Sequence, residues 1–272
     1  MSLGHVIVGA YLRAVRTHRN LTLHHAATLI DVSTAKISRF ENGLHQPSAD
    51  HVHRLAAAYG LTCTPCRTHL TQLLTPTEES TVLHDTQPGH HTRRSAAETG
   101  ATSLLYYTTQ LIPAPFQTND YRAALPTTES EHTHPDAHPQ LPTTPTPTHR
   151  PTTLFLDESI LHRTLVPPHT LAHQLHTLHR LSYRTHYTVR IVPFAAGPTH
   201  HPGTLTEINR PHHRLYAHHT HHTTWTTTPP HTLLHHLHTH ALTPDTTRHT
   251  LRQAADRLTH HNGRRAVSTV RR

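Results

Sequence analysis

The side chains with the clearest chemical potential lie in the heptapeptide STAKISR, which runs from Ser33 to Arg39. Lys36 and Arg39 carry donors that suit phosphate oxygens and the acceptor atoms of guanine, while the Thr34 methyl group suits the methyl of thymine. Lys36 is also the only lysine of the chain, which fits a role for it but can equally arise by chance. This combination of short and basic side chains predicts one helix face that meets a nucleic acid.

The residues around this heptapeptide must hold it in position. Leu21 to Leu44 reads as two short helices joined by a tight turn, in which Thr22 caps the first helix and Ser33 the second. Ile37 and Phe40, three residues apart, face inward. A helix-turn-helix of this layout places its second helix in the major groove of DNA, and the alternative is a helical hairpin that only packs internally. The candidate DNA-binding residues are Thr22, Ser33, Thr34, Ala35, Lys36 and Arg39.

Residues 1–75 predict an all-α domain of five helices. The two central helices follow a helix from about Val6 to Arg19, and they precede a helix that Ser48 caps and Gly60 ends. The fifth helix begins near Pro65, with Thr64 as its cap. Residues 1–75 carry seven lysine and arginine residues against three acids, a net charge of +4. We therefore expect them to be the DNA-binding domain.

The composition also favours a polyanionic partner. The chain has 272 residues, a formal net charge of +8 and 37 histidines. About a quarter of unperturbed histidines are protonated at pH 7, which adds about nine charges and attracts nucleic acid. No apolar run approaches membrane-spanning length, and the N-terminus lacks the layout of a signal peptide, so we expect a soluble, cytoplasmic protein.

Histidine and cysteine support two alternative interpretations. The histidines, densest from His218 to His222, suit a metal-responsive DNA-binding regulator, because imidazole binds zinc, nickel and copper. They are nevertheless spread along the whole chain, as compositional drift predicts. Cys63 and Cys66 have the spacing of half a zinc site or of a redox pair, but no second pair completes a zinc site. We expect neither a metal site nor a cofactor.

No motif in the sequence indicates catalysis. The chain has no GxSxG nucleophile elbow, no glycine loop for phosphates and no paired carboxylates placed for acid–base chemistry. Asp157 and Glu158 read as the start of a helix. We expect that the protein is not an enzyme.

The second half of the chain predicts an α+β domain. A polar linker is expected at 76–94 and the domain at 95–262, with an insertion rich in proline, threonine and histidine at 126–151 and a basic tail at 263–272. Apolar patterns predict strands near 153–156, 187–194, 203–208 and 214–217. They predict helices near 96–107, 171–183, 233–242 and 245–258.

Several segments resemble known regulators. VSTAKISRFENG and PSADHVHRLAAAYGL resemble the Xre/lambda-repressor type of helix-turn-helix domain. Further on, TSLLYYTTQLIPAPFQTNDYRAAL, FLDESILHR, VRIVPFAAG and ALTPDTTRHTLRQAADRL resemble a toxin–antitoxin-like C-terminal domain of the actinobacterial WhiJ type. The resemblance implies a lambda-repressor-like fold and an antitoxin-like transcriptional regulator. Its C-terminal domain would dimerise the protein or bind a small partner protein encoded nearby, and the dimer would bind a two-fold site on double-stranded DNA.

Three residues of the helix-turn-helix part depart from the pattern of that family. Asp31 stands where a turn glycine is usual, although aspartate tolerates the left-handed conformation. Leu23 replaces a glutamine that contacts phosphate, and His25 replaces the acidic residue that completes the capping box. These changes predict weaker DNA binding than in typical members.

Overall fold

The computed structural model describes residues 2–75, 81–126, 150–163, 165–199 and 201–269, with side chains up to residue 259. These residues fall into two compact units. The first unit contains the chain up to Ser103 together with Glu207–Pro229. The second contains Leu104–Thr127, Thr146–Thr206 and the chain from Pro230 onward. Most of the insertion expected at 126–151 lies outside the described residues.

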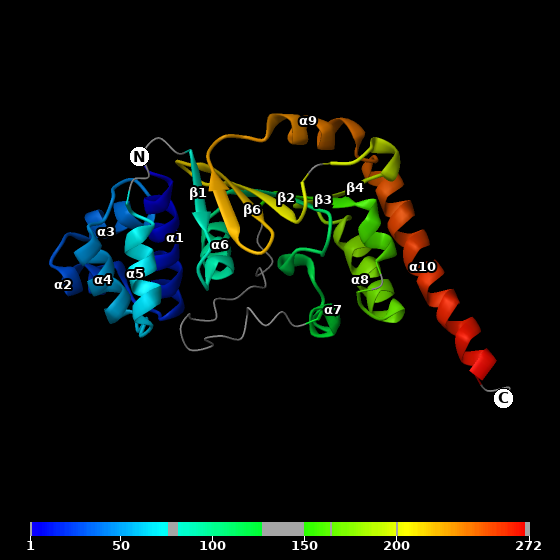
Figure 1. Cartoon of the computed structure of the whole chain (residues 1–272), viewed down its shortest axis with the longest axis horizontal. Coiled ribbons are helices and arrows are strands. Elements are labelled where there is room, and N and C mark those ends of the chain that lie inside the picture. The colour runs from blue at the N-terminus through cyan, green and yellow to red at the C-terminus, as the bar shows by residue number, and fades with distance from the viewer. Residues whose placement is uncertain (1, 76–80, 127–149, 164, 200, 270–272) are drawn as a thin grey trace. The chain divides into compact units, whose positions relative to one another are not determined.

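Five helices open the first unit, as the sequence predicts (Figure 1). The third helix packs on the first and the second, and the fourth packs on the second and the fifth. The helices are α1 (Leu3–His18), α2 (Leu23–Ile30), α3 (Thr34–Glu41), α4 (Ala49–Ala58) and α5 (Thr64–Gln72).

Side-chain caps fix where these helices start. The hydroxyl oxygens of Thr22, Ser33 and Ser48 each accept a hydrogen bond from the backbone N–H three residues further on, at 3.1–3.2 Å. This confirms the predicted caps, each of which stabilises its helix by about 1 kcal/mol.

The predicted cap of α5 is wrong. Thr64 is the first residue of that helix, and its cap is Cys63, whose Sγ accepts the N–H of Cys66 at 3.2 Å.

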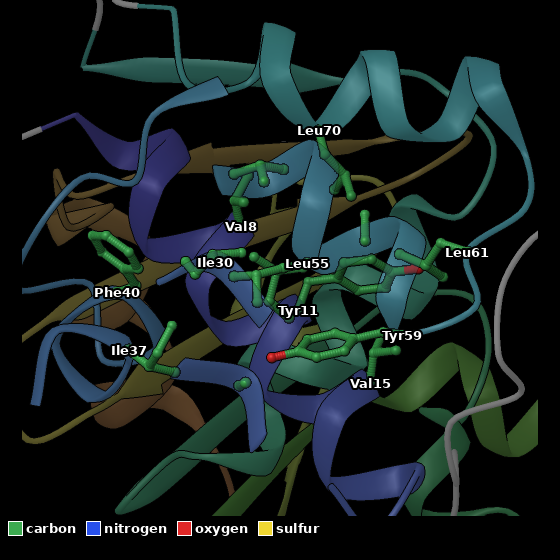
Figure 2. Close-up of a cluster of buried hydrophobic side chains, with 14 of the residues drawn as sticks. Val8, Tyr11, Val15, Ile30, Ile37, Phe40, Leu55, Tyr59, Leu61 and Leu70 are labelled. Atoms are coloured by element: carbon green, nitrogen blue, oxygen red, sulfur yellow. The ribbon is translucent and has the colours of Figure 1, made fainter. Parts of the chain in front are cut away.

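One apolar core holds the five helices together (Figure 2). Tyr11 and Val15 of α1 meet Ile30 of α2 and Ile37 and Phe40 of α3, and none of these side chains is more than 2% exposed. Burying an apolar side chain of this size contributes about 1.5–3 kcal/mol, so the core outweighs the weak intrinsic stability of helices this short. Val8, Leu55, Tyr59, Leu61 and Leu70 complete the part of the core that Figure 2 labels.

A buried ion pair joins α1 to α3. The Arg16 guanidinium donates from Nε and Nη2 to the two carboxylate oxygens of Glu41, at 2.6 and 2.8 Å. Its Nη1 donates to the carbonyl oxygen of Leu21, at 2.6 Å. The Arg16 and Glu41 side chains are 11% and 5% exposed. The hydrogen bond to Glu41 raises the pKa of Arg16, and the bidentate geometry fixes the end of α3 against α1.

A sixth helix and three strands complete the first unit. α6 (His90–Thr99) packs on α1, and β1 (Val82–Asp85) pairs antiparallel with β7 (Thr223–Thr226), which pairs antiparallel with β6 (Arg214–His219). Part of the expected linker at 76–94 therefore contains a strand and the start of a helix. The predicted helix over 96–107 is wrong beyond Thr99, because the apolar and aromatic run after it forms a strand.

A buried charge cluster connects α5, β1 and α6. The Asp85 carboxylate accepts hydrogen bonds from Arg93 Nε and Nη2 at 2.8 and 2.6 Å, and from His69 Nε2 at 3.0 Å. Asp85 and Arg93 are fully buried and His69 nearly so. Burial by itself raises the pKa of Asp85, but the hydrogen bonds from His69 and Arg93 outweigh it and lower that pKa to about 2. Asp85 is therefore ionised at neutral and mildly acidic pH.

The second unit is built on parallel strands. β2 (Ser103–Thr108) pairs parallel with β3 (Thr152–Asp157), which pairs parallel with β4 (Tyr187–Val192). With β5 (Thr204–Asn209), the strands of the described residues form one mixed seven-stranded sheet in the order β1-β7-β6-β5-β2-β3-β4. Sheet and helices together confirm the α+β prediction. The other elements are η1 (Ala114–Phe116), α7 (Asn119–Ala124), η3 (Glu158–His162), α8 (Pro168–Leu181), η4 (Phe194–Ala196), α9 (His231–His240) and α10 (Pro244–Thr269).

The segment between α9 and α10, together with the first turn of α10, covers the outer edge of β4 at Ile191. Ile191 donates its N–H to Thr247 Oγ1 at 3.2 Å and accepts the N–H of Leu242 at 2.8 Å. These bonds occupy backbone groups that would otherwise offer an open sheet edge to another chain. α10 then packs along α8 and continues to Thr269, into the expected basic tail. No helix of the described residues is both long and apolar enough to cross a lipid bilayer.

Replacing Glu41 by glutamine tests the ion pair. Glu41→Gln leaves the buried Arg16 charge without a counter-charge, so the free energy of unfolding should fall by about 3 kcal/mol in urea denaturation. The matched control is Asp50→Asn, because Asp50 is exposed and lies 3.8 Å from Arg54. That change should cost less than about 1 kcal/mol. Equal losses in the two variants would show that burial of the Arg16 pair has no special weight.

Buried histidines of the first unit predict a loss of stability in mild acid. Burial lowers the pKa of His90 to about 4, and that of the neighbouring His219 to about 3. Between pH 6.5 and 4 the unfolded chain binds protons that the folded chain does not, so stability falls as the pH falls through this window. From pH 7 to pH 5, His90 alone should remove about 2 kcal/mol.

Urea denaturation of the wild type and His90→Gln at pH 7 and pH 5 measures this effect. The pH-dependent loss should be smaller in His90→Gln, because glutamine does not titrate. His24→Gln, which changes an exposed histidine of α2, should keep the wild-type pH dependence. An unchanged pH dependence in His90→Gln would contradict the assignment of the acid sensitivity to His90.

Candidate nucleic-acid interface

The structure places the predicted contact residues on one accessible side of α3. Ser33, Thr34, Ala35 and Arg39 are exposed and Lys36 is half-buried. Ile37 and Phe40, on the other side of the same helix, are at most 1% exposed. Thr22 is also exposed, at the start of α2. The sequence pattern therefore predicted correctly which side chains of α3 face outward, while their roles toward DNA stay predictions.

The turn between α2 and α3 is held by its backbone. Asp31 has φ 54° and ψ 56°, the left-handed conformation for which glycine is usual. Val32 donates its N–H to the carbonyl oxygen of Ala27 at 3.1 Å, which closes the end of α2. The chain then reaches the Ser33 cap within two residues, so α3 starts at a fixed angle to α2.

Two cations dominate the charge of this exposed side. Arg39 makes no side-chain hydrogen bond or ion pair to any described residue, and Lys36 Nζ lies 5.8 Å from the centre of the Phe40 ring. Burial, and next the charge of Lys36, lower the pKa of the adjacent His51, so this imidazole is neutral at pH 7. Lys36 and Arg39 can therefore donate to an anionic ligand without first breaking an internal ion pair.

The end of α3 is anchored by residues that sequence reasoning missed. Arg13 Nη1 of α1 donates to Asn42 Oδ1 at 2.9 Å, and His5 Nε2 donates to the carbonyl oxygen of Gly43 at 2.9 Å. Gly43 has φ +69°, and a Cβ there would lie 3.0 Å from the Val6 Cα, so any other residue would be strained at this position. With Arg16 and Glu41, these are positioning residues for α3. Gly43 can be recognised in the sequence as a residue that ends a helix, whereas nothing in the sequence identifies the side-chain partners.

The described residues offer no second site of comparable clarity. No group of three or more histidine, cysteine or acidic side chains among them is placed to hold a metal ion. The histidines from His218 to His222 lie at the end of β6, which stops at His219, and in the turn before β7, which begins at Thr223. The aromatic residues Tyr106 and Tyr107 are buried in the core.

The arrangement can bind a phosphate backbone and reach base edges at once. Helix starts at Thr22 and Ser33 present free backbone N–H groups that suit phosphate oxygens. The side chains of Thr34 and Ala35 are short, so the exposed side of α3 can come close to the floor of a major groove. Its cations supply the attraction to a polyanion.

Comparison with protein families assigns both parts of the chain. A helix-turn-helix domain model matches residues 7–68, which contain α2 and α3, and this match supports a DNA-binding regulator. A model of a domain of unknown function, DUF5753, matches residues 92–253. Comparison with curated proteins and with solved structures gives no significant match. Since the second model covers more than half of the chain, the protein belongs to the DUF5753 family and carries a helix-turn-helix domain ahead of that region.

Proposed function

We propose that this protein is a sequence-specific, double-stranded DNA-binding transcriptional regulator that inserts α3 into the major groove. The observation that carries the proposal is the division of α3 into a buried apolar side and an exposed side with two cations, Lys36 and Arg39. The helix-turn-helix match over residues 7–68 supports it. The protein would act by occupying DNA, without catalysing a reaction.

Each exposed residue has a role in this proposal. Thr34 and Lys36 meet base edges, where lysine donates to guanine and the threonine methyl packs on thymine. Arg39 reaches a base or a phosphate, and Ala35 permits the close approach. Thr22 and Ser33 place the first N–H groups of α2 and α3 against phosphates.

The C-terminal part would control this binding. We propose that it carries homodimer contacts or binds a small partner protein, as the resemblance to antitoxin-like WhiJ-type regulators implies. The second unit keeps four large apolar side chains at the surface, and aromatic and apolar groups of this kind are what protein partners cover. They are Leu111 at 38% exposed, Leu165 at 43%, Tyr183 at 63% and Phe194 at 60%. No specific observation favours the metal-responsive alternative.

Alanine substitutions on α3 test the DNA contacts. A duplex is first selected from a random pool by the wild-type protein. Lys36→Ala should then weaken binding to it by about 1–3 kcal/mol, roughly 5- to 150-fold in Kd, and relax the preference for one base pair. Arg39→Ala should weaken binding too, and if Arg39 contacts phosphate the slope of log K against log salt should fall by about one.

The control for these variants is Arg252→Ala, which removes the same charge from an exposed position of α10. It should bind within about twofold of the wild type, because a charge outside the helix-turn-helix domain acts on DNA only through screened long-range attraction. Circular dichroism checks the fold of each variant. If Lys36→Ala and Arg39→Ala both bind like the control, the assignment of the groove-facing helix is wrong.

The proposed dimer predicts a two-fold binding site. The selected duplex should contain an inverted repeat whose half-sites lie about 10 base pairs apart or a multiple of that, because each α3 needs its own stretch of major groove. Native mass spectrometry of the complex should show two chains per duplex. A single half-site bound by one chain would contradict the dimer while leaving the DNA contacts intact.

A further inference from the structure

The beginning of α5 holds the only two cysteines of the chain. Cys63 and Cys66 are joined by a disulfide, with a sequence separation of 3 residues. Cys63 is the cap of the helix, Thr64 and Pro65 form its first turn, and both cysteines are half-buried rather than enclosed. A reagent in solution can therefore reach this turn without unfolding of the domain.

This disulfide is poorly placed to stabilise the fold. It closes a loop inside a single helical turn, and the chain entropy that a cross-link removes from the unfolded state grows with loop length. The apolar core around α1 to α5 is already closed by buried side chains such as Leu70 of the same helix. A cross-link with so little structural effect calls for a chemical role.

The surroundings of Cys63 favour its thiolate when the disulfide is open. The Cys66 N–H donates to Cys63 Sγ at 3.2 Å, and α5 adds the partial positive charge of a helix start. Arg67 Nη2 donates to Thr64 Oγ1 at 3.3 Å, which holds a guanidinium in the same turn. A backbone donor and a cation in the same helical turn stabilise a thiolate, and the thiolate is the nucleophile in disulfide chemistry.

The cellular compartment of the protein gives a further reason to assign a redox role to this disulfide, and this step rests on the proposed function. A DNA-binding regulator shares the compartment of its DNA, where thiol pools reduce structural disulfides. Disulfides in such compartments are usually transient and serve catalysis or redox sensing. The position of Cys63 and Cys66 at an accessible helix start agrees with that use.

We propose that Cys63 and Cys66 form a reversible thiol–disulfide exchange site whose substrates are low-molecular-weight disulfides and thiols. In the oxidising direction the Cys63 thiolate attacks a disulfide RSSR, the S–S bond of RSSR breaks, and one RS⁻ leaves. The Cys66 thiolate then attacks Cys63 Sγ of the mixed disulfide and displaces the second RS⁻. The protein dithiol is oxidised by two electrons, RSSR is reduced to two thiols, and the two RS⁻ ions take up the protons that the cysteines released.

A redox titration of the full-length protein without DNA tests the proposal. The protein is equilibrated with glutathione buffers of increasing GSH to GSSG ratio and alkylated with iodoacetamide, and mass spectrometry counts the blocked cysteines. Oxidised and doubly reduced forms should interconvert with the ratio from either starting state, while circular dichroism shows a folded protein throughout. Since no DNA is present, this result is independent of whether the protein binds an operator.

Two single variants separate the roles of the cysteines. Cys66→Ser should accumulate a mixed disulfide between Cys63 and glutathione, because the resolving thiol is missing. Cys63→Ser retains an oxygen that can cap α5, and its remaining Cys66 should react about tenfold more slowly, because it lacks the cap position. Faster reaction at Cys66 would overturn the assignment of Cys63 as nucleophile.

Two results of the titration would overturn the exchange site itself. The first is a disulfide that stays closed in excess GSH until denaturant is added, which would make it a structural cross-link. The second is a folded dithiol that excess GSSG never closes. Both readings use the wild-type chain, so they hold even if a cysteine variant fails to fold.

Discussion

The ion pair between Arg16 and Glu41 fixes the one helix on which the proposed activity depends. α3 has only eight residues, and a helix of that length has little stability of its own. Its apolar side enters the core through Ile37 and Phe40, and the bidentate contact with Arg16 sets its direction. The desolvation of two charges offsets much of their attraction, so we interpret the contribution of the pair as geometric more than energetic.

The same pair shapes the charge of the DNA-binding domain. Glu41 is buried against an arginine, and the exposed Asp50 lies beside Arg54, so two of the three acids in residues 1–75 face a cation of their own domain. The cations of α3 remain directed outward. A small domain thus presents positive charge on the side where a polyanion would approach, although its net charge is modest.

A second buried cluster extends this frame beyond the five helices. Asp85 on β1 binds Arg93 of α6 and His69 of α5, so the helix that begins with the Cys63–Cys66 disulfide also ends in a charge contact with the sheet. These hydrogen bonds therefore join the five N-terminal helices to β1 and α6, which follow them in the chain. Thiol–disulfide exchange at the start of α5 would act on a helix that contacts both the five-helix core and β1.

The sequence by itself determined the features that depend on a few neighbouring residues. Hydroxyl caps at Thr22, Ser33 and Ser48 and the inward spacing of Ile37 and Phe40 act within one or two helical turns, so the five helices and the exposed side of α3 were predictable. Most strands of the α+β part were visible for the same reason, as alternating apolar residues.

Tertiary structure decided whatever needs a distant partner. β1 was hidden in a polar stretch because Val82 gains its place only by pairing with Thr226, and the run from Ser103 became a strand because it pairs with β3. Arg16 and Glu41 lie 25 residues apart, and nothing local marks them as partners. Which charges are buried together depends on how the chain closes on itself, and local propensity carries no information about that.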